Sequence, residues 1–374
     1  MRKYTHLPII DMHMHILSPH STAKPEYYQQ PEILNAQCMI DKLGWLDLKA
    51  MNILAVTLFD KEDLVTNPLT LYTKTLAPDK IYTFTGLRRE LTSFEHPNMR
   101  EQLISLLDTG FDGVKMICKP NVRKKWNVKI NDPVFFDFYA YMEEHRVPLL
   151  FHVGDPEYFW DPERTPDWAK DRGWYYGDDK DLPTMEEMYA ETDDLLRRYP
   201  LLNVCFPHFH FMSANLPRVQ SMFDTYPNVR FDLTPNPDMY VDFSNNLAAA
   251  REFFIKNHNK ILMGTDSVGA PTRLIIDPDK EKPEHTIHGI IRFLESDGPM
   301  ELFGETVHGL GLPEEVCRRI FADNFLDFVG GMPPKPVNRD RAVKLCQEYL
   351  ELLGGQTDTH TGRMLQELSS LLKG

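Results

Sequence analysis

Short apolar runs alternate with longer amphipathic runs over the first 330 residues of this 374-residue chain. The apolar runs are rich in strand-forming residues, and the amphipathic runs have the period of α-helices. Strands that alternate with helices indicate βα units and a parallel sheet. The predicted strands span residues 8–15, 53–59, 81–87, 113–117, 148–153, 203–208, 229–233 and 261–265.

The helices predicted between these strands include residues 98–108, 134–144, 185–198 and 215–226. In the last of them Leu216, Val219 and Met222 fall on one face, as in an amphipathic helix. Prolines such as Pro148 and Pro200 mark the points where a helix must stop before the next strand. Eight strands, each followed by a helix, predict an α/β fold of the (β/α)8 TIM barrel type, which takes about 250 residues.

Two segments account for the remaining length. Residues 154–183 follow the fifth predicted strand and are rich in Trp, Tyr and Pro, and a loop of this length in a compact domain is usually functional. We expect a lid over the barrel mouth, although the aromatic residues could equally pack the insertion onto the barrel. Residues 333–374 have leucines at helical spacing. We expect a helical extension of a barrel domain at 1–332, either packed outside the barrel or forming a subunit contact in a homo-oligomer.

Composition excludes several classes of partner. The formal net charge of −14 disfavours nucleic acid and anionic membranes, so we expect a small-molecule substrate. No run is long enough to span a membrane, and the apolar run near the N-terminus is too short and polar for a signal peptide. The five cysteines are scattered and lack Cys-x-x-Cys spacing, which disfavours a disulfide framework. These features predict a cytoplasmic protein.

The first predicted strand carries His13 and His15, two residues apart. Side chains at i and i+2 of a strand point to the same face, so the two imidazoles would share one small volume. The alternative is a pair of exposed loop histidines, and the remaining strands must decide between the two.

Polar residues stand at the carboxyl ends of several predicted strands. In a barrel these ends form a ring around one axis, and active sites lie there. The residues are His13 and His15 on the first strand, Lys115 on the fourth, His152 on the fifth, His208 on the sixth and Asp266 after the eighth. Such a set on separate strands predicts one pocket with metal-binding or catalytic chemistry.

The motifs that carry these residues resemble the amidohydrolase superfamily, and within it the branch related to aminocarboxymuconate-semialdehyde decarboxylase. The resemblance covers roughly residues 9–331. It rests on Ile-Ile-Asp-Met-His-Met-His at 9–15, Gly-Phe-Asp-Gly-Val-Lys at 110–115, Pro-Leu-Leu-Phe-His at 148–152, Cys-Phe-Pro-His at 205–208, Met-Gly-Thr-Asp at 263–266 and Ala-Asp-Asn-Phe-Leu-Asp-Phe at 322–328.

The resemblance implies that one divalent metal, zinc or manganese, is held by His13, His15, His152 and Asp266. It implies that His208 is a catalytic acid/base or a ligand of a second site, and that Asp266 can also act as a base. Three imidazoles and a carboxylate are good zinc ligands. Imidazole titrates near neutral pH, which suits His208 to proton transfer.

Other polar residues have weaker assignments. In some members of the superfamily a carbamylated lysine bridges two metals at the position of Lys115, but we favour one metal, with Lys115 binding substrate. His210 shares a face with His208 if the strand continues, so the two could exchange roles or His210 could contact substrate. Asp11 is in phase with His13 and is expected to orient a ligand histidine or to pack as a buried carboxylate.

Cations near the predicted mouth suit a substrate carboxylate. The candidates are Arg88 and Arg89 after the third strand, Lys119 after the fourth and Arg273 after the eighth. Each could also be an ordinary surface charge.

The predicted function is metal-dependent hydrolysis of a small carboxylate-bearing amide, ester or lactone through metal-activated water. The first alternative is a non-oxidative decarboxylase that uses the same site. The second is a barrel that has lost catalysis and only binds, which the intact set of histidines and Asp266 disfavours.

Overall fold

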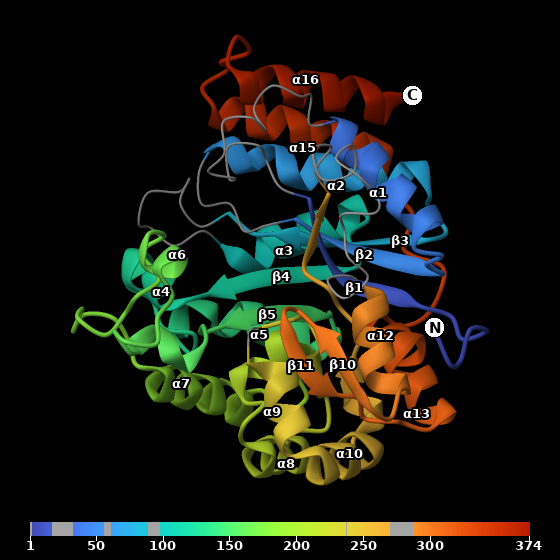
Figure 1. Cartoon of the computed structure of the whole chain (residues 1–374). Coiled ribbons are helices and arrows are strands. Elements are labelled where there is room, and N and C mark those ends of the chain that lie inside the picture. The colour runs from blue at the N-terminus through green and yellow to red at the C-terminus, as the bar shows by residue number, and fades with distance from the viewer. Residues whose placement is uncertain (1, 17–32, 56–60, 89–97, 237, 270–286) are drawn as a thin grey trace.

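The computed structural model describes residues 2–16, 33–55, 61–88, 98–236, 238–269 and 287–374. Within these residues the chain folds into a curled parallel sheet surrounded by helices (Figure 1). Arg89 and Arg273, two of the cations predicted to bind a substrate carboxylate, lie outside the described residues.

The sheet contains nine strands in the order β8-β7-β6-β5-β4-β3-β2-β1-β9, and all neighbours are parallel. The strands are β1 (Ile10–Ile16), β2 (Ala50–Ala55), β3 (Ile81–Gly86), β4 (Gly113–Cys118), β5 (Leu149–Val153), β6 (Val204–Phe206), β7 (Val229–Asp232), β8 (Ile261–Leu262) and β9 (Ser267–Gly269).

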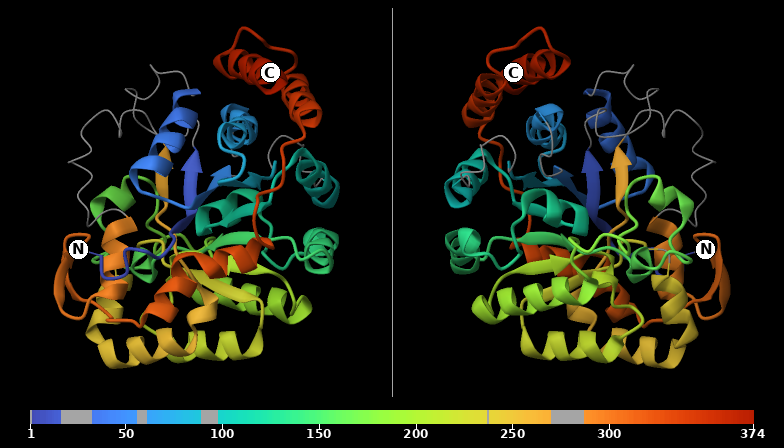
Figure 2. Two further views of the ribbon diagram at one scale, coloured as in Figure 1. Left: turned by 90° about the vertical axis from the view of Figure 1, so that its right-hand side faces the viewer. Right: turned by 90° about the vertical axis from the view of Figure 1, so that its left-hand side faces the viewer.

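The last two strands are pieces of one run that closes the sheet. β8 pairs with β7, and β9 pairs with β1, beside which it lies in Figure 2. Between the two pieces, the Met12 N–H donates to the Met263 carbonyl (3.0 Å) and the Asp266 N–H to the His13 carbonyl (2.8 Å). Eight strand positions therefore form the predicted barrel.

Helices follow the strands and surround the sheet. They are α1 (Ile33–Trp45), α2 (Thr66–Leu76), α3 (Met99–Thr109), α4 (Pro120–Trp126), α5 (Phe136–Glu144), α7 (Met185–Arg198), α8 (Leu216–Thr225), α9 (Met239–Asn245), α10 (Leu247–Lys256), α12 (Ile287–Glu295), α13 (Glu314–Arg318) and α14 (Asn324–Val329). Helix α7 has the predicted bounds, and a capping box of Thr184 and Glu187 fixes its start. Asn98 and Asn215, predicted as first helical residues, are instead the caps of α3 and α8.

The barrel interior has its own apolar core, separate from the layer between sheet and helices. One residue or more from β1, β2, β3, β5, β6 and β8 joins it, together with Phe325 and Phe328 of α14. Asn324 of α14 donates to the Ile261 carbonyl at the start of β8. Helix α14 therefore covers the amino ends of the strands, which leaves the carboxyl ends for the site.

A β-bulge in β1 separates this core from the site. Asp11 pairs with Met51 and Met14 with Ile53, so β1 has one extra residue between the two pairs. Met12 lies in the apolar core inside the barrel, whereas Met14 lies in the apolar layer between the sheet and the helices. The bulge breaks the phase of the strand, so the prediction that Asp11 is in phase with the two histidines is wrong.

The insertion after β5 has a small core of its own. It contains η5 (Glu157–Trp160) and α6 (Asp167–Lys170), and its buried residues include Tyr158, Phe159 and Tyr176. It begins at the carboxyl end of β5, as expected for an insertion beside the mouth. The prediction that it acts as a lid stays a prediction.

The C-terminal helices α15 (Arg339–Leu352) and α16 (His360–Lys373) pack on each other and lie against α2 on one side of the barrel (Figure 1). A hairpin of β10 (Pro299–Leu302) and β11 (Glu305–His308) follows α12. None of the helices in the described ranges has the length and apolar character needed to cross a membrane.

Candidate metal centre

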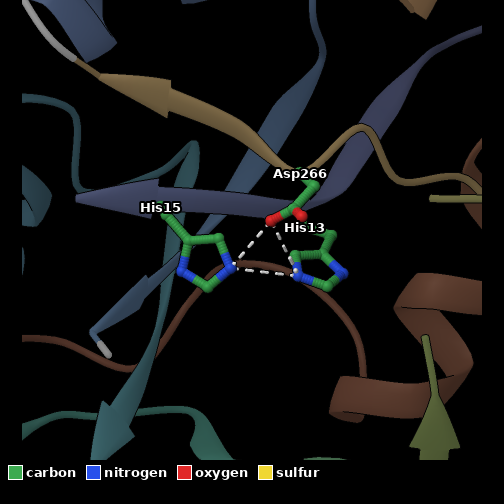
Figure 3. A group of neighbouring side chains, drawn as sticks. All are labelled: His13, His15 and Asp266. Carbon is green, nitrogen blue, oxygen red and sulfur yellow. Dashed lines mark hydrogen bonds and ion pairs between the residues drawn. The ribbon is translucent and has the colours of Figure 1, made fainter. Parts of the chain in front are cut away.

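Three ligand atoms come together from His13 and His15 of β1 and from Asp266, which lies between β8 and β9 (Figure 3). The Nε2 atoms of the two histidines are 3.1 Å apart. Asp266 Oδ1 lies 3.0 Å from His15 Nε2 and 3.5 Å from His13 Nε2. Two atoms bound to one tetrahedral zinc at about 2.0–2.1 Å lie roughly 3.3–3.4 Å apart. The triangle therefore fits a divalent metal in both spacing and donor type.

The backbone at Asp266 aims its carboxylate at this triangle. Asp266 has a left-handed conformation with φ of 57°, and its N–H donates to the His13 carbonyl. Its side chain is 42% exposed, whereas that of His13 is 1% exposed. Burial raises the pKa of Asp266, but the hydrogen bond from His15 and the electrostatic interaction with the neighbouring imidazoles outweigh it and hold the pKa well below the ordinary value. A carboxylate that is charged and open on one side suits a metal ligand.

His13 is surrounded by polar groups. Its Nδ1 lies 2.8 Å from Asp232 Oδ2 and 3.0 Å from Thr234 Oγ1, and Lys115 Nζ is 3.3 Å from its Nε2. Burial, reinforced by the charge of Lys115, holds the pKa of His13 well below its ordinary value. His13 is therefore a neutral imidazole, the form that binds metals.

His152 lies close to this group but outside the triangle. Its Nε2 donates to the Gly154 carbonyl (3.0 Å), and its ring stands edge-on to that of His208 at 4.8 Å between centroids. The structure thus brings together three of the four predicted ligands, with His152 beside them. Burial lowers the pKa of His152, so this imidazole is also neutral.

The prediction that His208 ends the sixth strand is wrong. Strand β6 stops at Phe206, and residues 208–211 all have left-handed backbone conformations with φ of 54–56°, each costing about 1–2 kcal/mol for residues other than glycine. Side chains of three residues hold this turn. The His208 N–H donates to Asp232 Oδ1, Asn236 donates to the His208 carbonyl, and the Tyr189 hydroxyl donates to the His210 carbonyl.

The turn places His208 at the site. Its ring lies 6.0 Å from that of His13 between centroids, and its Nδ1 is 3.2 Å from the Pro235 carbonyl. A carbonyl can only accept, so Nδ1 carries the proton and Nε2 has the free lone pair. Burial and the neighbouring His152 lower the pKa of His208 to about 4. His208 is therefore neutral at physiological pH.

His210 points away from the site. Its ring stacks on Phe206 at 4.4 Å and meets Tyr189 of α7 edge-on, and Phe206 belongs to the outer layer between sheet and helices. The left-handed turn removes the strand alternation on which the shared face of His208 and His210 depended. The structure therefore does not bring His210 to the predicted substrate pocket.

The predicted cations have different surroundings. Lys115 is buried beside His13, and burial lowers its pKa to about 8 against the opposing charges of Asp266 and Asp232. The Arg88 guanidinium instead lies over the ring of Tyr349 in α15. Lys119 forms an ion pair with Asp155 (2.9 Å) at the base of the insertion. Of these cations only Lys115 joins the histidine cluster.

Two carboxylates support the histidines. Asp11 is fully buried and accepts from the His13 N–H and from Thr265, as expected of a buried supporting carboxylate, and burial raises its pKa to about 7. Asp232, the last residue of β7, contacts both His13 and His208, and the sequence analysis missed it. The rule used for the other strands, a polar residue at the carboxyl end, would have found it.

Comparisons with known proteins agree with this architecture. A family model described as amidohydrolase matches residues 10–330. Among solved structures, the chain is similar to IDCase of Metarhizium anisopliae in its apo form, with a TM-score of 0.55 and 12% identity over 88% of this chain and 99% of that chain. It is also similar to 4-oxalomesaconate hydratase from Rhodopseudomonas palustris, with a TM-score of 0.52 and 15% identity over 92% of this chain and 99% of that chain. No curated protein matches the sequence.

Proposed function

This chain belongs to the amidohydrolase family, and on that premise we propose that it is a metal-dependent hydrolase of a small amide, ester or lactone that carries a carboxylate. The observation that carries the proposal is the triangle of His13 Nε2, His15 Nε2 and Asp266 Oδ1. Its three edges of 3.0, 3.1 and 3.5 Å fit one divalent metal. A divalent metal, when bound there, would polarise a carbonyl and make water a better nucleophile at neutral pH.

His13, His15 and Asp266 would hold the metal, and we retain His152 as the fourth ligand. His152 would give up its hydrogen bond to the Gly154 carbonyl. Zinc suits this set of imidazoles and one carboxylate, and manganese is the second choice. The donor set favours one metal per chain.

His208 would accept a proton during hydrolysis. Its Nδ1 proton is committed to the Pro235 carbonyl, and its pKa of about 4 keeps it neutral above that pH. A neutral imidazole with a free Nε2 lone pair is a base rather than an acid. Hydrolysis needs a base that accepts a proton from water. The neutral form of His208 therefore favours hydrolysis over a reaction that needs an imidazolium as proton donor.

Lys115 would bind the substrate. It is a buried cation beside His13, and an ammonium in a water-poor pocket attracts a carboxylate or a developing oxyanion strongly. The carboxylate of the proposed substrate would therefore lie next to the scissile bond.

Lys115 also favours the second candidate function, non-oxidative decarboxylation. A pKa of about 8 gives an ammonium that can release a proton near neutral pH. That reaction needs a proton for the carbon that loses carbon dioxide, and Lys115 could supply it. The same metal ligands would serve.

A labelling experiment separates the two reactions. The protein reconstituted with zinc or manganese is tested on carboxylate-bearing amides, esters and lactones, and on unsaturated and aromatic carboxylic acids, in 18O-water and separately in deuterium oxide. Hydrolysis places 18O in the new carboxylate. Decarboxylation releases carbon dioxide and places deuterium on carbon. Activity on neither set, with metal bound, would contradict both functions.

A further inference from the structure

We propose that Asp232 is a positioning residue that fixes the tautomer of His13, so that the His13 Nε2 lone pair faces the metal position, and that the same carboxylate anchors the turn of His208. The inference rests on the proposed metal site. It assigns a role to a residue on β7, which contributes none of the proposed ligands.

Asp232 is surrounded by hydrogen-bond donors. Its Oδ1 accepts from the N–H groups of His208 (2.9 Å) and Thr234 (3.0 Å). Its Oδ2 lies 2.8 Å from His13 Nδ1, and the side chain is fully buried. Backbone N–H groups can only donate, so this carboxylate acts as an acceptor toward them, and its remaining oxygen is placed to accept from Nδ1.

An independent contact on the other side of the ring gives the same tautomer. Lys115 Nζ lies 3.3 Å from His13 Nε2. An ammonium donates hydrogen bonds and accepts none, so Nε2 is the acceptor and Nδ1 carries the proton. Two groups on separate strands, Asp232 of β7 and Lys115 of β4, therefore agree on which nitrogen is protonated.

The backbone at Gly264 packs closely against His13, Thr234 and Asp232. A Cβ at Gly264 would lie 2.8 Å from His13 Cβ, 2.8 Å from Thr234 Oγ1 and 3.4 Å from Asp232 Oδ2. β1, β7 and the β8–β9 run therefore pack closely around the contact between His13 and Asp232. A supporting carboxylate that fixes ring orientation usually matters 10–100-fold for metal affinity.

Asp232 contacts both a proposed metal ligand and the turn that carries the proposed base. Through Oδ2 it contacts a proposed ligand, and through Oδ1 it holds the first residue of a left-handed turn that carries the proposed base. One carboxylate therefore sets the position of His208 relative to His13.

The test is Asp232→Asn in the full-length protein. Asparagine keeps an oxygen for the His208 and Thr234 N–H groups but presents N–H groups to His13 Nδ1, which moves the ring proton to Nε2. We expect zinc affinity, measured by competition with a chelator, to fall 10–100-fold while the far-UV circular dichroism spectrum is unchanged. A folded variant with zinc affinity within threefold of wild type would overturn the proposal.

Asp112→Asn is the matched control. Asp112 is also a buried carboxylate that accepts from two backbone N–H groups, those of Thr83 and Lys335. It directly precedes β4 and pairs with Lys74 of α2, which contributes no residue to the proposed site. We expect Asp112→Asn to lower the free energy of unfolding and to leave zinc affinity within threefold of wild type. An equal loss of zinc affinity in both variants would reduce the effect to general destabilisation and contradict the proposal.

A measurement on the wild type does not depend on folding of the variant. In metal-free protein labelled with 15N-histidine, the resonances of His13, identified by their loss in His13→Gln, should report a protonated Nδ1 and an unprotonated Nε2. A protonated Nε2 would overturn the assignment. If the wild type bound no zinc, the proposed function would fail, and the tautomer would still decide the role of Asp232.

Discussion

The ring of His210 stacks on that of Phe206 with 4.4 Å between centroids, and neither ring nitrogen of His210 has a hydrogen-bond partner in the described part of the chain. Burial, with the charge of Arg218, lowers the pKa of His210 to about 3. The unfolded chain has an ordinary histidine with a pKa of about 6.5. Between these two pH values the unfolded state binds the extra proton, so this histidine destabilises the fold as pH falls from 6.5 toward 3.

His210→Phe should therefore make stability less dependent on pH. At pH 4.5 this one histidine should lower the free energy of unfolding of the wild type by about 2–3 kcal/mol, and the variant should not show this loss. Urea unfolding at pH 7 and pH 4.5 measures the difference. His145→Phe, at an exposed position, is the control for replacing a histidine by phenylalanine. An unchanged pH dependence in His210→Phe would contradict the assignment.

Gly264→Ala should disturb the site through packing alone. The new methyl group would lie 2.8 Å from His13 Cβ, and overpacking of this kind typically costs 1–3 kcal/mol. We expect lower zinc affinity and a lower free energy of unfolding. Gly44→Ala is the control: Gly44 lies in α1 with no atom within 4 Å of the added Cβ, so stability should stay the same or rise. Wild-type zinc affinity in Gly264→Ala would contradict the account.

His208→Asn separates chemistry from metal binding. Asparagine keeps some hydrogen bonding but cannot exchange a proton at neutral pH. We expect most of the metal to remain and the rate on the identified substrate to fall by about 10²–10⁴-fold. Loss of metal together with activity would make His208 a ligand. Retention of both would remove it from the mechanism.

Tyr176→Phe tests how the insertion is anchored. The Tyr176 hydroxyl donates to Asp155 Oδ2 (2.5 Å), and Asp155 also pairs with Lys119. Loss of a buried hydrogen bond to a carboxylate typically costs about 1.5–3 kcal/mol, which chemical unfolding would detect. Tyr175→Phe is the control, because Tyr175 bonds to Asp178 at an exposed position, and it should change stability by less than about 0.5 kcal/mol. If the insertion is a lid, ligand binding should also change Trp160 fluorescence.

The sequence predicted the barrel because short apolar runs alternate with amphipathic runs. It predicted the site because polar residues stand near the carboxyl ends of several predicted strands. That pattern found His13, His15, Lys115 and Asp266, which the fold brings together. The interruption between β8 and β9 did not affect the prediction, because both pieces occupy one strand position.

Local pattern failed where the backbone leaves regular structure. The turn at 208–211 has left-handed residues without glycine or asparagine, so no turn signal marked it. It is held by tertiary contacts from Asp232, Asn236 and Tyr189. The bulge at 11–14 likewise depends on pairing with β2. Both features position a proposed site histidine, and both are invisible to periodicity.

The central claim is that His13, His15 and Asp266 hold a divalent metal. The most direct measurement is the metal content of the purified protein by mass spectrometry after growth with zinc and manganese, for the wild type and for His13→Ala. We expect about one metal ion per chain in the wild type and little or none in His13→Ala, with activity restored to stripped wild type by added metal. A wild type without stoichiometric metal, or a His13→Ala variant that keeps it fully, would contradict the claim.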